Sequence, residues 1–349
     1  MITVLPVFRE EGWHSMDLCS DMLVKHSPTR SELRLSVPHY RKIFGFLPWK
    51  KVQNFNRWYN RWKIYPKHVE KLGSQNGFFH IVDHSYAHLA NYLPDGKVGI
   101  YCHDLDAFRC ILFPDQEIRP LWFRRMMSQV FEGFKKARIV FCSTHITRDH
   151  LLKLGIWKAE AILVVPYGVA TEFTPEGDKE RGEYILNVGS CITRKRVDVL
   201  FDAFAKVSKQ FANLKLIQAG GSFSTDQINQ LCRLNLKNKV EQRRNLTREG
   251  LARLYRGAKC LVITSEAEGF GLPIIEGLAC GAKIIASDIP ILREVGGPNI
   301  CYFPAKNPDA CAEVILKFLK TYNSFLEITA SRWSWASHAS DICRAYESL

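Results

Sequence analysis

The stretch that most constrains the fold is residues 261–297, which reads as strand, turn, helix and strand. Residues 261–264 form a short apolar run, and an acidic, glycine-rich turn follows them. Pro273 stands where a first helical residue is expected, and Gly281 stands just past the expected helix end. A second apolar run at residues 283–286 completes the unit. Because such a unit is the repeat of a parallel sheet, the sequence predicts an α/β fold.

The turn in this unit has the composition of a ligand site. Glu268 and Glu276 are separated by seven residues, one before the helix and one in its first turns. Between them, Gly269 and Gly271 leave backbone N–H groups unhindered at the positive end of a helix, a place that holds phosphate. Ionised carboxylates accept several hydrogen bonds and therefore suit hydroxyl-rich groups. The pattern predicts a site for a nucleotide sugar.

Length and composition narrow the class of protein. The 349 residues suggest two domains, and 46% apolar content is ample for packed cores. No apolar run approaches the ~20 residues that cross a bilayer, and residues 1–8 read as a first strand rather than a signal peptide. The eleven cysteines include no CxxC pair, which is typical of reduced thiols and argues against a zinc site or a disulfide framework. We therefore expect a cytoplasmic protein.

The net charge of +13 is unevenly distributed. Residues 1–170 hold 24 Lys/Arg against 15 Asp/Glu, a net of +9, and 11 of these cations lie in residues 30–71. There Arg57 and Arg61 are four apart, as are Trp58 and Trp62, so a helix would carry adjacent basic and aromatic rows. Inward packing of the aromatics with solvated cations is one interpretation. Peripheral contact with an anionic membrane, at its inner face, is another. Nucleic acid is not expected, because no binding motif accompanies the charge.

Polar residues follow expected strands in the first half of the chain, where open α/β sheets bind ligands. Gly12 follows the first strand and is either a tight turn or part of a ligand site. His103 follows the strand expected at residues 97–102. His80, His84 and His88 recur every four residues, but this run begins as a strand, so the three would not share a helix face. No metal site is predicted.

A polar stretch at residues 170–183 separates two sets of α/β units and reads as a linker. We expect residues 1–169 plus 334–349 to form the first domain and residues 170–333 the second. The second set begins with a strand at residues 184–188 that ends at Gly189 and Ser190. The cationic run at residues 193–196 could be merely solvated, but beside this turn we favour an anion site.

These pieces, in this order, resemble the retaining GT-B glycosyltransferases of family 4. The matching pieces are HDLDAF at residues 103–108, FCSTHITRDH at 141–150, VVPYGVATEFTP at 164–175, ILNVGSCITRKRVDVLFDAF at 185–204, LIQAGG at 216–221, LARLYRGAKCLVITSEAEGFGLPIIEGLACG at 251–281 and SDIPILREVGG at 287–297. The segment EGFGLPIIE is the family's specific E-x7-E signature. The resemblance implies two Rossmann-like domains that face each other across a cleft, with the last helix returning to the N-terminal domain. The donor is expected on the C-terminal domain and the acceptor on the N-terminal one.

The resemblance also implies roles for single residues. Glu276 is expected to bind the ribose hydroxyls, and Glu268 the hydroxyls of the transferred sugar. Arg194 and Lys195 match the basic pair that neutralises the diphosphate, and His103 matches a histidine near that sugar. The expected catalytic set is therefore His103, Glu268, Lys195 and Arg194. The expected nucleotide-sugar contacts are Gly12, Gly189, Ser190, Arg194, Lys195, Arg244, Leu246, Glu268, Gly269, Phe270, Gly271, Leu272 and Glu276.

The chain departs from the family pattern in two places. Gly12 stands alone where many members have two adjacent glycines, and Arg243 with Arg244 replaces an apolar–glycine pair at the nucleotide edge. The first departure leaves phosphate or acceptor contacts at Gly12 open. The second means that the choice of donor does not transfer from the family.

The implied reaction moves a hexose from a nucleotide-diphosphate sugar, UDP-glucose first and GDP-mannose second, to a glycan or a polyprenyl-diphosphate-linked acceptor. This fits envelope or extracellular polysaccharide synthesis. The reaction is expected to retain configuration and to need no metal or further cofactor, because Arg194, Lys195 and the helix N-terminus stabilise the departing diphosphate. We favour same-face attack over a covalent intermediate on Glu268. Two alternatives stay open: a GT-B nucleotide-sugar epimerase or hydrolase, and a non-catalytic, membrane-associated basic protein with a degenerate transferase core.

Overall fold

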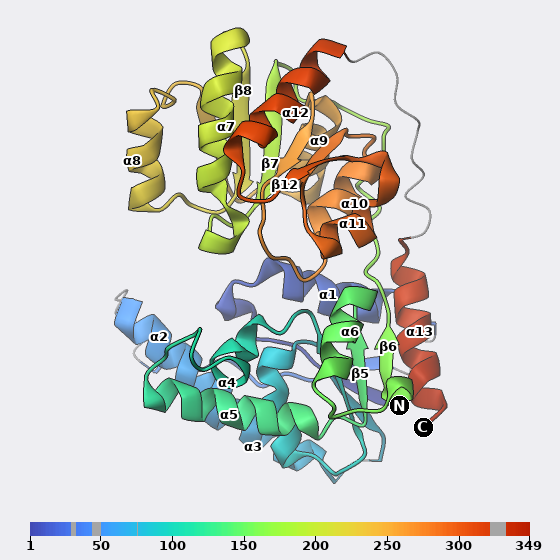
Figure 1. Ribbon diagram of the computed structural model, residues 1–349. Coiled ribbons are helices and arrows are strands. Elements are labelled where there is room, and N and C mark those ends of the chain that lie inside the picture. Colours follow the sequence, from blue (N-terminus) through green and yellow to red (C-terminus); the bar gives the residue numbers. More distant parts are fainter. Residues whose placement is uncertain (29–32, 44–49, 75, 322–332) are drawn as a thin grey trace. The chain divides into compact units, whose positions relative to one another are not determined.

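The computed structural model describes residues 1–28, 33–43, 50–74, 76–321 and 333–349. It divides into two compact units, one of Met1–Gly168 with Ser334–Leu349 and one of Val169–Trp333 (Figure 1). Each unit contains one sheet of six parallel strands with helices packed on it. The α/β fold with two Rossmann-like domains is therefore confirmed.

The first unit has the strand order β2-β1-β3-β4-β5-β6. Its strands are β1 (Ile2–Leu5), β2 (Leu33–Leu35), β3 (Phe78–Ile81), β4 (Val98–Cys102), β5 (Ile139–Cys142) and β6 (Ile162–Val164). Its helices are α1 (His14–Lys25), α2 (Lys50–Tyr59), α3 (Tyr65–Leu72), α4 (Arg109–Leu112), α5 (Leu121–Lys135), α6 (His145–Lys153) and α13 (Trp335–Glu347). Short 3-10 turns are η1 (Arg9–Glu11), η3 (His84–Tyr92), η4 (Asp106–Phe108) and η5 (Ala159–Ala161), and η2 (Asn60–Ile64) is a π-helical turn.

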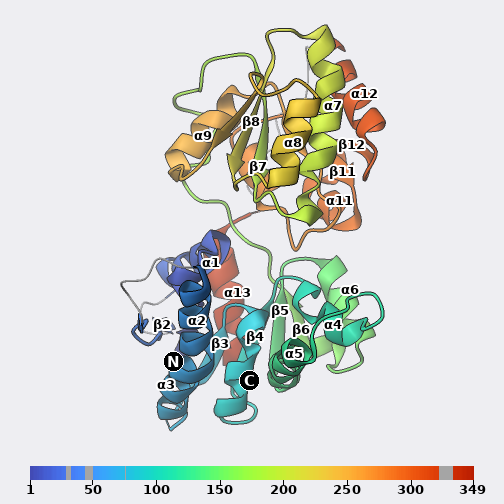
Figure 2. The same cartoon turned by 90° about the vertical axis from the view of Figure 1, so that its left-hand side faces the viewer.

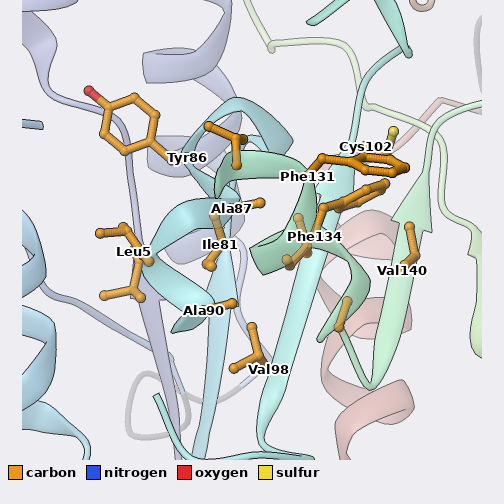
Figure 3. Packing of buried hydrophobic residues seen from close by; sticks show 14 of the residues in the cluster. Leu5, Ile81, Tyr86, Ala87, Ala90, Val98, Cys102, Phe131, Phe134 and Val140 are labelled. Carbon is orange, nitrogen blue, oxygen red and sulfur yellow. The ribbon is translucent and has the colours of Figure 1, made fainter. Parts of the chain in front are cut away.

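The core of this unit forms between the sheet and α5. Figure 3 shows Phe131 and Phe134 of α5 in one cluster with Ile81, Val98 and Val140 from three successive strands. All five are buried. These strands read as nearly continuous apolar runs because both faces of a parallel sheet are covered.

The second unit has the strand order β12-β11-β10-β7-β8-β9. Its strands are β7 (Tyr184–Gly189), β8 (Lys215–Gly220), β9 (Val240–Arg243), β10 (Leu261–Ile263), β11 (Ile284–Asp288) and β12 (Cys301–Pro304). Its helices are α7 (Val197–Gln210), α8 (Thr225–Arg233), α9 (Arg248–Gly257), α10 (Leu272–Ala279), α11 (Pro290–Gly296) and α12 (Pro308–Thr321), with 3-10 turns η6 (Thr193–Lys195) and η7 (Gly297–Asn299). In Figure 2 the strands β7 and β8 lie between α9 on one side and α7 with α8 on the other.

Both sheets contain a point where the strand order reverses. In the first sheet β1 lies between β2 and β3, and in the second β7 lies between β8 and β10. Open parallel sheets bind ligands beyond the carboxyl ends of the strands at such a reversal. Ligand sites are therefore expected in the segments that follow β1 and β3 in the first unit, and β7 and β10 in the second.

Two segments of the chain connect the units, one at residues 170–183 and one that leads into α13. Residues 170–183 belong to the second unit and are held by Arg256, which donates to the carbonyl oxygens of Thr174 at 3.1 Å and Asp178 at 2.8 Å. After α12 the structure resumes at Trp333, and α13 belongs to the first unit, as the resemblance implied (Figure 1). There the Tyr346 hydroxyl lies 3.0 Å from Nδ1 of His80 on β3.

The basic segment at residues 30–71 is described only in part, because residues 30–32 and 44–49 lie outside the described residues. From Lys50 onward α2, η2 and α3 follow each other without a break. Tyr65 is fully buried, whereas Phe55 and Trp58 are exposed. Inward packing therefore accounts for some of these aromatics but not for all. None of the described helices is both long enough and apolar enough to cross a bilayer.

Candidate functional site

In the second unit, the turns after β7 and β10 bring three predicted residues together. The Lys195 Nζ lies 2.6 and 2.7 Å from the two carboxylate oxygens of Glu268. Arg194 places Nη1 3.5 Å from Oε2 of the same carboxylate. The Glu268 side chain is 6% exposed and that of Lys195 is 17% exposed. Residues that are 73 positions apart in sequence thus form one partly buried cationic group around a carboxylate, at the point where the strand order reverses.

Polar residues on the strand ends hold this group in place. The Ser265 hydroxyl donates to Glu268 Oε1 at 2.6 Å, and the Ser287 hydroxyl donates to the carbonyl oxygen of Ser265. The Thr264 hydroxyl donates to the carbonyl oxygen of Lys195 at 2.9 Å. Sequence reasoning missed these three residues. Only their position along the chain could have identified them, because Thr264 and Ser265 directly follow β10 and Ser287 lies in β11.

Glycine is required where the ends of β7 and β8 meet. Gly189 has φ +141° and Gly220 has φ +124°, a region that side-chain-bearing residues rarely adopt. A Cβ on Gly220 would lie 2.7 Å from the carbonyl oxygen of Gly189, and one on Gly221 would lie 2.5 Å from the backbone nitrogen of Cys191. A Cβ on Gly189 would only touch Lys195 Cε at 3.8 Å. Ser190 is exposed beside this turn. The backbone is therefore close-packed where the ends of β7 and β8 meet.

The helix α10 begins without a side-chain cap. Its N-cap residue is Gly271 with φ +102°, and Leu272 is the first helical residue. An uncapped N-terminus leaves backbone N–H groups for an anion, which keeps the predicted contact of Leu272 with the diphosphate open. The ring of Phe270 is buried and packs edge-on against Trp333 at 5.4 Å between ring centroids. Any ligand contact of Phe270 is therefore made by its backbone.

Glu276 is buried on α10, and its Oε2 accepts a hydrogen bond from the Tyr255 hydroxyl at 2.9 Å. Burial raises the pKa of this carboxyl to about 7, against the smaller opposing effects of Tyr255 and Arg248. Its Oε1 has no hydrogen-bond partner among the described residues. A buried carboxylate with one unused oxygen suits a pair of hydroxyl donors, the role that the resemblance gave it. Tyr255 was missed by sequence reasoning.

The two arginines at the expected nucleotide edge behave differently. Arg243 on β9 pairs with Glu241 at 2.6 Å and with Glu180 at 3.0 Å, so it contributes to the structure of this edge. Arg244 is exposed, and its Nη1 donates to the Ser222 hydroxyl at 3.0 Å. Leu246 is also exposed. Arg244 and Leu246 are thus accessible to a base, whereas Arg243 is occupied.

In the first unit, His103 is buried after β4 and both its ring nitrogens have partners. Nε2 lies 2.9 Å from the carbonyl oxygen of Val82, and Nδ1 meets the Tyr167 hydroxyl. Burial lowers the pKa of His103, and the neighbouring His84 also contributes. A neutral ring that donates from Nε2 and accepts at Nδ1 satisfies both contacts. His103, which is predicted to lie near the transferred sugar, is thus held in a fixed orientation. Its partner Tyr167 was missed by sequence reasoning.

Gly12 is the last of the predicted residues, and the three spaced histidines were not predicted to bind a metal. Gly12 ends η1 with φ +73°, and a Cβ there would meet nothing within 4 Å. His80, His84 and His88 have separate partners, namely Tyr346, Asp83 and the carbonyl oxygen of Arg61. Across the part of the chain that the structure describes, no group of three or more His, Cys, Asp or Glu residues could hold a metal ion.

Comparisons with known proteins agree with this architecture. Residues 169–333 match the family described as "Glycosyl transferases group 1". The chain is 29% identical over 211 residues to the O-antigen chain mannosyltransferase RfbU of Salmonella typhimurium, which covers 60% of this chain and 56% of that protein. It is 24% identical over 270 residues to the O-antigen chain mannosyltransferase B of Escherichia coli, covering 71% of this chain and 69% of that protein. The matches thus span between half and about two thirds of these relatives.

Solved structures show the same fold over the whole chain. The crystal structure of Anabaena HepE in complex with UDP and glucose superposes with a TM-score of 0.73 at 16% identity and covers 100% of this chain and 99% of that one. The structure of WaaG, a glycosyltransferase involved in lipopolysaccharide biosynthesis, has a TM-score of 0.65 at 14% identity and covers 99% of this chain and 97% of that one. The fold is therefore GT-B. The match to the group 1 glycosyltransferase family coincides with the second unit.

Proposed function

We propose that this chain transfers a hexose from a nucleotide-diphosphate sugar to a hydroxyl group of a growing polysaccharide. The observation that carries the proposal is the group formed by Arg194, Lys195 and Glu268 at the strand reversal of a group 1 domain. Two cations there can neutralise a departing diphosphate, and the uncapped end of α10 adds N–H donors. Glu276 binds the ribose hydroxyls with its unused carboxylate oxygen.

The sugar that we propose is mannose, supplied as GDP-mannose. Two relatives named above are O-antigen chain mannosyltransferases, and a 32% identical relative over 190 residues is the MMP alpha-(1->4)-mannosyltransferase of Mycolicibacterium hassiacum. UDP-glucose is the second candidate, because HepE has been solved with UDP and glucose. We propose a role in polysaccharide synthesis because the first two relatives are named O-antigen chain mannosyltransferases.

We propose that transfer retains the anomeric configuration by same-face attack. The bond between the anomeric carbon and the diphosphate oxygen breaks, the acceptor hydroxyl oxygen bonds to that carbon, and the hydroxyl proton passes to the departing diphosphate. Glu268 is a poor nucleophile for the covalent route, because Lys195 and Ser265 already donate to its carboxylate. It is better suited to orient the sugar while Lys195 remains at the diphosphate.

A donor screen tests the proposal. Purified protein is incubated with GDP-mannose, UDP-glucose and ADP-glucose, and release of nucleoside diphosphate is measured together with binding by isothermal titration. We expect GDP-mannose to be hydrolysed fastest and the Lys195→Ala variant to be about 10²–10³-fold slower than wild type on every donor. Binding of no nucleoside diphosphate would favour the non-catalytic alternative, and an epimerised donor would favour the epimerase.

Peripheral contact with an anionic membrane is a further part of the proposal. Exposed aromatics on α2, Phe55 and Trp58, accompany the basic segment. At the start of α5, Ile118 is 87%, Leu121 71% and Trp122 67% exposed, beside exposed arginines. Large apolar side chains among cations suit the interface of an anionic bilayer.

Flotation with vesicles tests this contact. Wild type is expected to float at low salt with vesicles that contain phosphatidylglycerol, and not with pure phosphatidylcholine. Replacing Leu121 and Trp122 with serine should reduce flotation at least several-fold and leave binding of nucleoside diphosphate unchanged. Equal flotation with both kinds of vesicle would contradict an electrostatic contribution, and no flotation with either would remove the membrane from the proposal.

A further inference from the structure

A second cluster of charged and aromatic side chains lies at the strand reversal of the first unit. It consists of Glu11 and Trp13, which follow β1, Tyr86, which follows β3, and Arg57 and Arg61 from the helical segment that runs through η2. We call it the Arg61 cluster. Because β1 and β3 are neighbours at the reversal point, the carboxyl ends of these strands mark the place where such sheets bind ligands.

Arg61 is positioned by several contacts. Its Nη2 donates to the carbonyl oxygen of Ser85, and its guanidinium lies 4.4 Å from the ring centroid of Tyr86 and 6.0 Å from that of Trp13. Its backbone carbonyl accepts from His88 Nε2 at 3.0 Å. Burial lowers the pKa of His88 to about 3, so this ring is neutral. Because Nε2 faces a carbonyl oxygen, the one ring proton lies on Nε2. A cation that packs against the Tyr86 ring and lies near the Trp13 ring is ordered before any ligand arrives.

The helix under Arg61 is also fixed. The buried Asn60 side chain accepts from the backbone nitrogen of Arg41 at 2.8 Å and donates to the carbonyl oxygens of Arg41 and Asn56 at 2.8 Å each. These bonds support the π-helical turn η2, an irregularity that often occurs at functional sites. Arg57 lies four residues earlier, so both guanidinium groups project from neighbouring turns.

The positive charge of the cluster is not balanced by ion pairs. Across the described residues neither Arg57 nor Arg61 lies within salt-bridge distance of a carboxylate, whereas Arg196 and Arg243 in the second unit each pair with two. Arg57 Nε donates to the backbone carbonyl of Glu10, at 3.3 Å. The Nε of Arg61 is buried and has no partner in the described structure. Two guanidinium groups that form no ion pair within the described residues are suited to an anion with several oxygens.

The remaining members suit a sugar. Trp13 is partly exposed and meets Tyr86 edge-on at 6.5 Å, so one indole face can cover the apolar face of a pyranose ring. The Tyr86 hydroxyl donates to Glu11 Oε1 at 3.0 Å, which orients a carboxylate that can accept sugar hydroxyls. Anion-binding and sugar-binding groups are thus combined in one place.

We propose that the Arg61 cluster binds the phosphorylated sugar end of the acceptor, with Arg57 and Arg61 on the phosphate oxygens and Trp13 on the sugar ring. This inference rests on the proposed function, because it assigns the acceptor of that reaction to the chemical class of sugar phosphates and sugar diphosphates. A free sugar phosphate and a prenyl-diphosphate-linked sugar share this chemistry, and the test separates them.

Calorimetric titration tests the inference, carried out in the Lys195→Ala background so that the diphosphate site of the second unit contributes least. The probes are geranyl-diphosphate-linked N-acetylglucosamine, N-acetylglucosamine 1-phosphate and inorganic pyrophosphate. Both sugar-bearing probes should bind, and pyrophosphate should bind at least ten-fold more weakly. Tighter binding of the geranyl probe would indicate that the acceptor is lipid-linked. Equal affinity for the two sugar probes would indicate that the acceptor is a free sugar phosphate. If pyrophosphate binds as tightly as either sugar-bearing probe, the claim that the cluster recognises a sugar is wrong.

Variants identify the residues responsible. Arg61→Gln and Arg57→Gln should each weaken binding of the sugar probes at least ten-fold. The matched control Arg138→Gln changes an exposed arginine that precedes β5, at the amino-terminal edge of the same sheet, and should have no effect. Because Arg61 packs on Tyr86, Arg61→Lys is included as a variant that keeps the charge, and it should bind at an intermediate level. Unchanged binding in both glutamine variants would overturn the inference.

The two proposals fail in different ways. If wild type binds nucleoside diphosphate and the glutamine variants bind the sugar probes normally, the acceptor subsite is wrong and the donor site stands. If wild type binds no nucleoside diphosphate but the sugar probes still depend on Arg57 and Arg61, the subsite stands as a sugar-phosphate site and the transferase proposal falls.

Discussion

At the scale of single residues, two carboxylates of the candidate donor site have different surroundings. Glu268 is surrounded by Lys195, Arg194 and Ser265, whereas Glu276 has only the Tyr255 hydroxyl as a direct partner among the described residues. A carboxylate with several cationic donors is held ionised in a fixed position. One buried with a single neutral donor is strained as an anion until a ligand provides more donors.

Glu276→Gln should therefore stabilise the protein while weakening nucleotide binding. The folded-state pKa of about 7 lies above the ordinary value of 4.5, so the native state binds the extra proton between these pH values. Stability falls as pH rises through this window, and the cost is complete above about pH 7. Removing the ionisable group should raise the free energy of unfolding by about 3 kcal/mol at about pH 8 and by little at about pH 4.5.

Denaturant unfolding at the two pH values, together with titration of GDP, checks this prediction. The amide oxygen introduced by the substitution can still accept from the Tyr255 hydroxyl, so packing is conserved. We expect GDP affinity to fall about ten-fold. A variant that is less stable than wild type at the higher pH would show that the carboxylate is not strained.

Lys195→Ala should act mainly on turnover. Loss of one preorganised cation at a developing negative charge costs about 10²–10³ in kcat. The same change leaves the Glu268 carboxylate buried with fewer donors, so a modest loss of stability is also expected. Lys215→Ala is the matched control, because Lys215 is exposed at the opposite, amino-terminal end of β8. A variant with normal kcat would remove Lys195 from the catalytic assignment.

At the scale of elements, the sequence predicted the strands and helices that have strong apolar patterns. The strands β1, β3, β4, β7, β10 and β11 fall where the sequence predicts strands. The weakly apolar run at Val240 forms β9, which is an edge strand and so needs less apolar character. The helix α8 was missed although Ser224 and Gln227 form a capping box, which is visible in sequence. The strand β2 was missed because it has only three residues and only Leu33 is buried.

The site was predicted residue by residue but not as an arrangement. The turn motifs identified Lys195 and Glu268, and only the order of the strands brings them into contact. Supporting residues such as Ser265 and Tyr255 belong to common residue types without a spacing pattern, so sequence carries little information about them. The Arg61 cluster shows the same limit, since its members come from three separate segments.

The strand ends also give a prediction about glycine. Gly220→Ala should destabilise the protein by more than about 3 kcal/mol, because a positive φ and a 2.7 Å approach to the carbonyl oxygen of Gly189 act together. Gly12→Ala is the comparison, since it has φ +73° but space around its Cβ, and it should cost about 1 kcal/mol. Chemical denaturation of both variants measures the difference. Equal losses would mean that the β7–β8 approach is not tight.

At the scale of the whole molecule, the chain leaves the first unit once and returns to it as α13. Trp335, Ile342 and Tyr346 of this helix are buried in the first unit, so that unit is completed only by the last helix. The Tyr346 hydroxyl lies 3.0 Å from His80 Nδ1 on β3, which links this helix to a central strand.

Tyr346→Phe should therefore weaken the first unit without touching the donor site. Removing the hydroxyl leaves the buried His80 nitrogen without this partner, at a cost of about 1–3 kcal/mol. Thermal unfolding followed by circular dichroism should show the loss, and the affinity for GDP should equal that of wild type. A variant with wild-type stability would contradict the assigned role of α13.

The most direct test of the central claim is transfer itself. Wild type, Lys195→Ala and Glu276→Gln are supplied with GDP-mannose and an acceptor sugar, and NMR reads the anomeric configuration of the product and the release of GDP. We predict mannoside formation by wild type with the donor's configuration retained, a kcat about 10²–10³ lower for Lys195→Ala, and a raised donor KM for Glu276→Gln. An inverted product, or equal activity of wild type and Lys195→Ala, would contradict this claim.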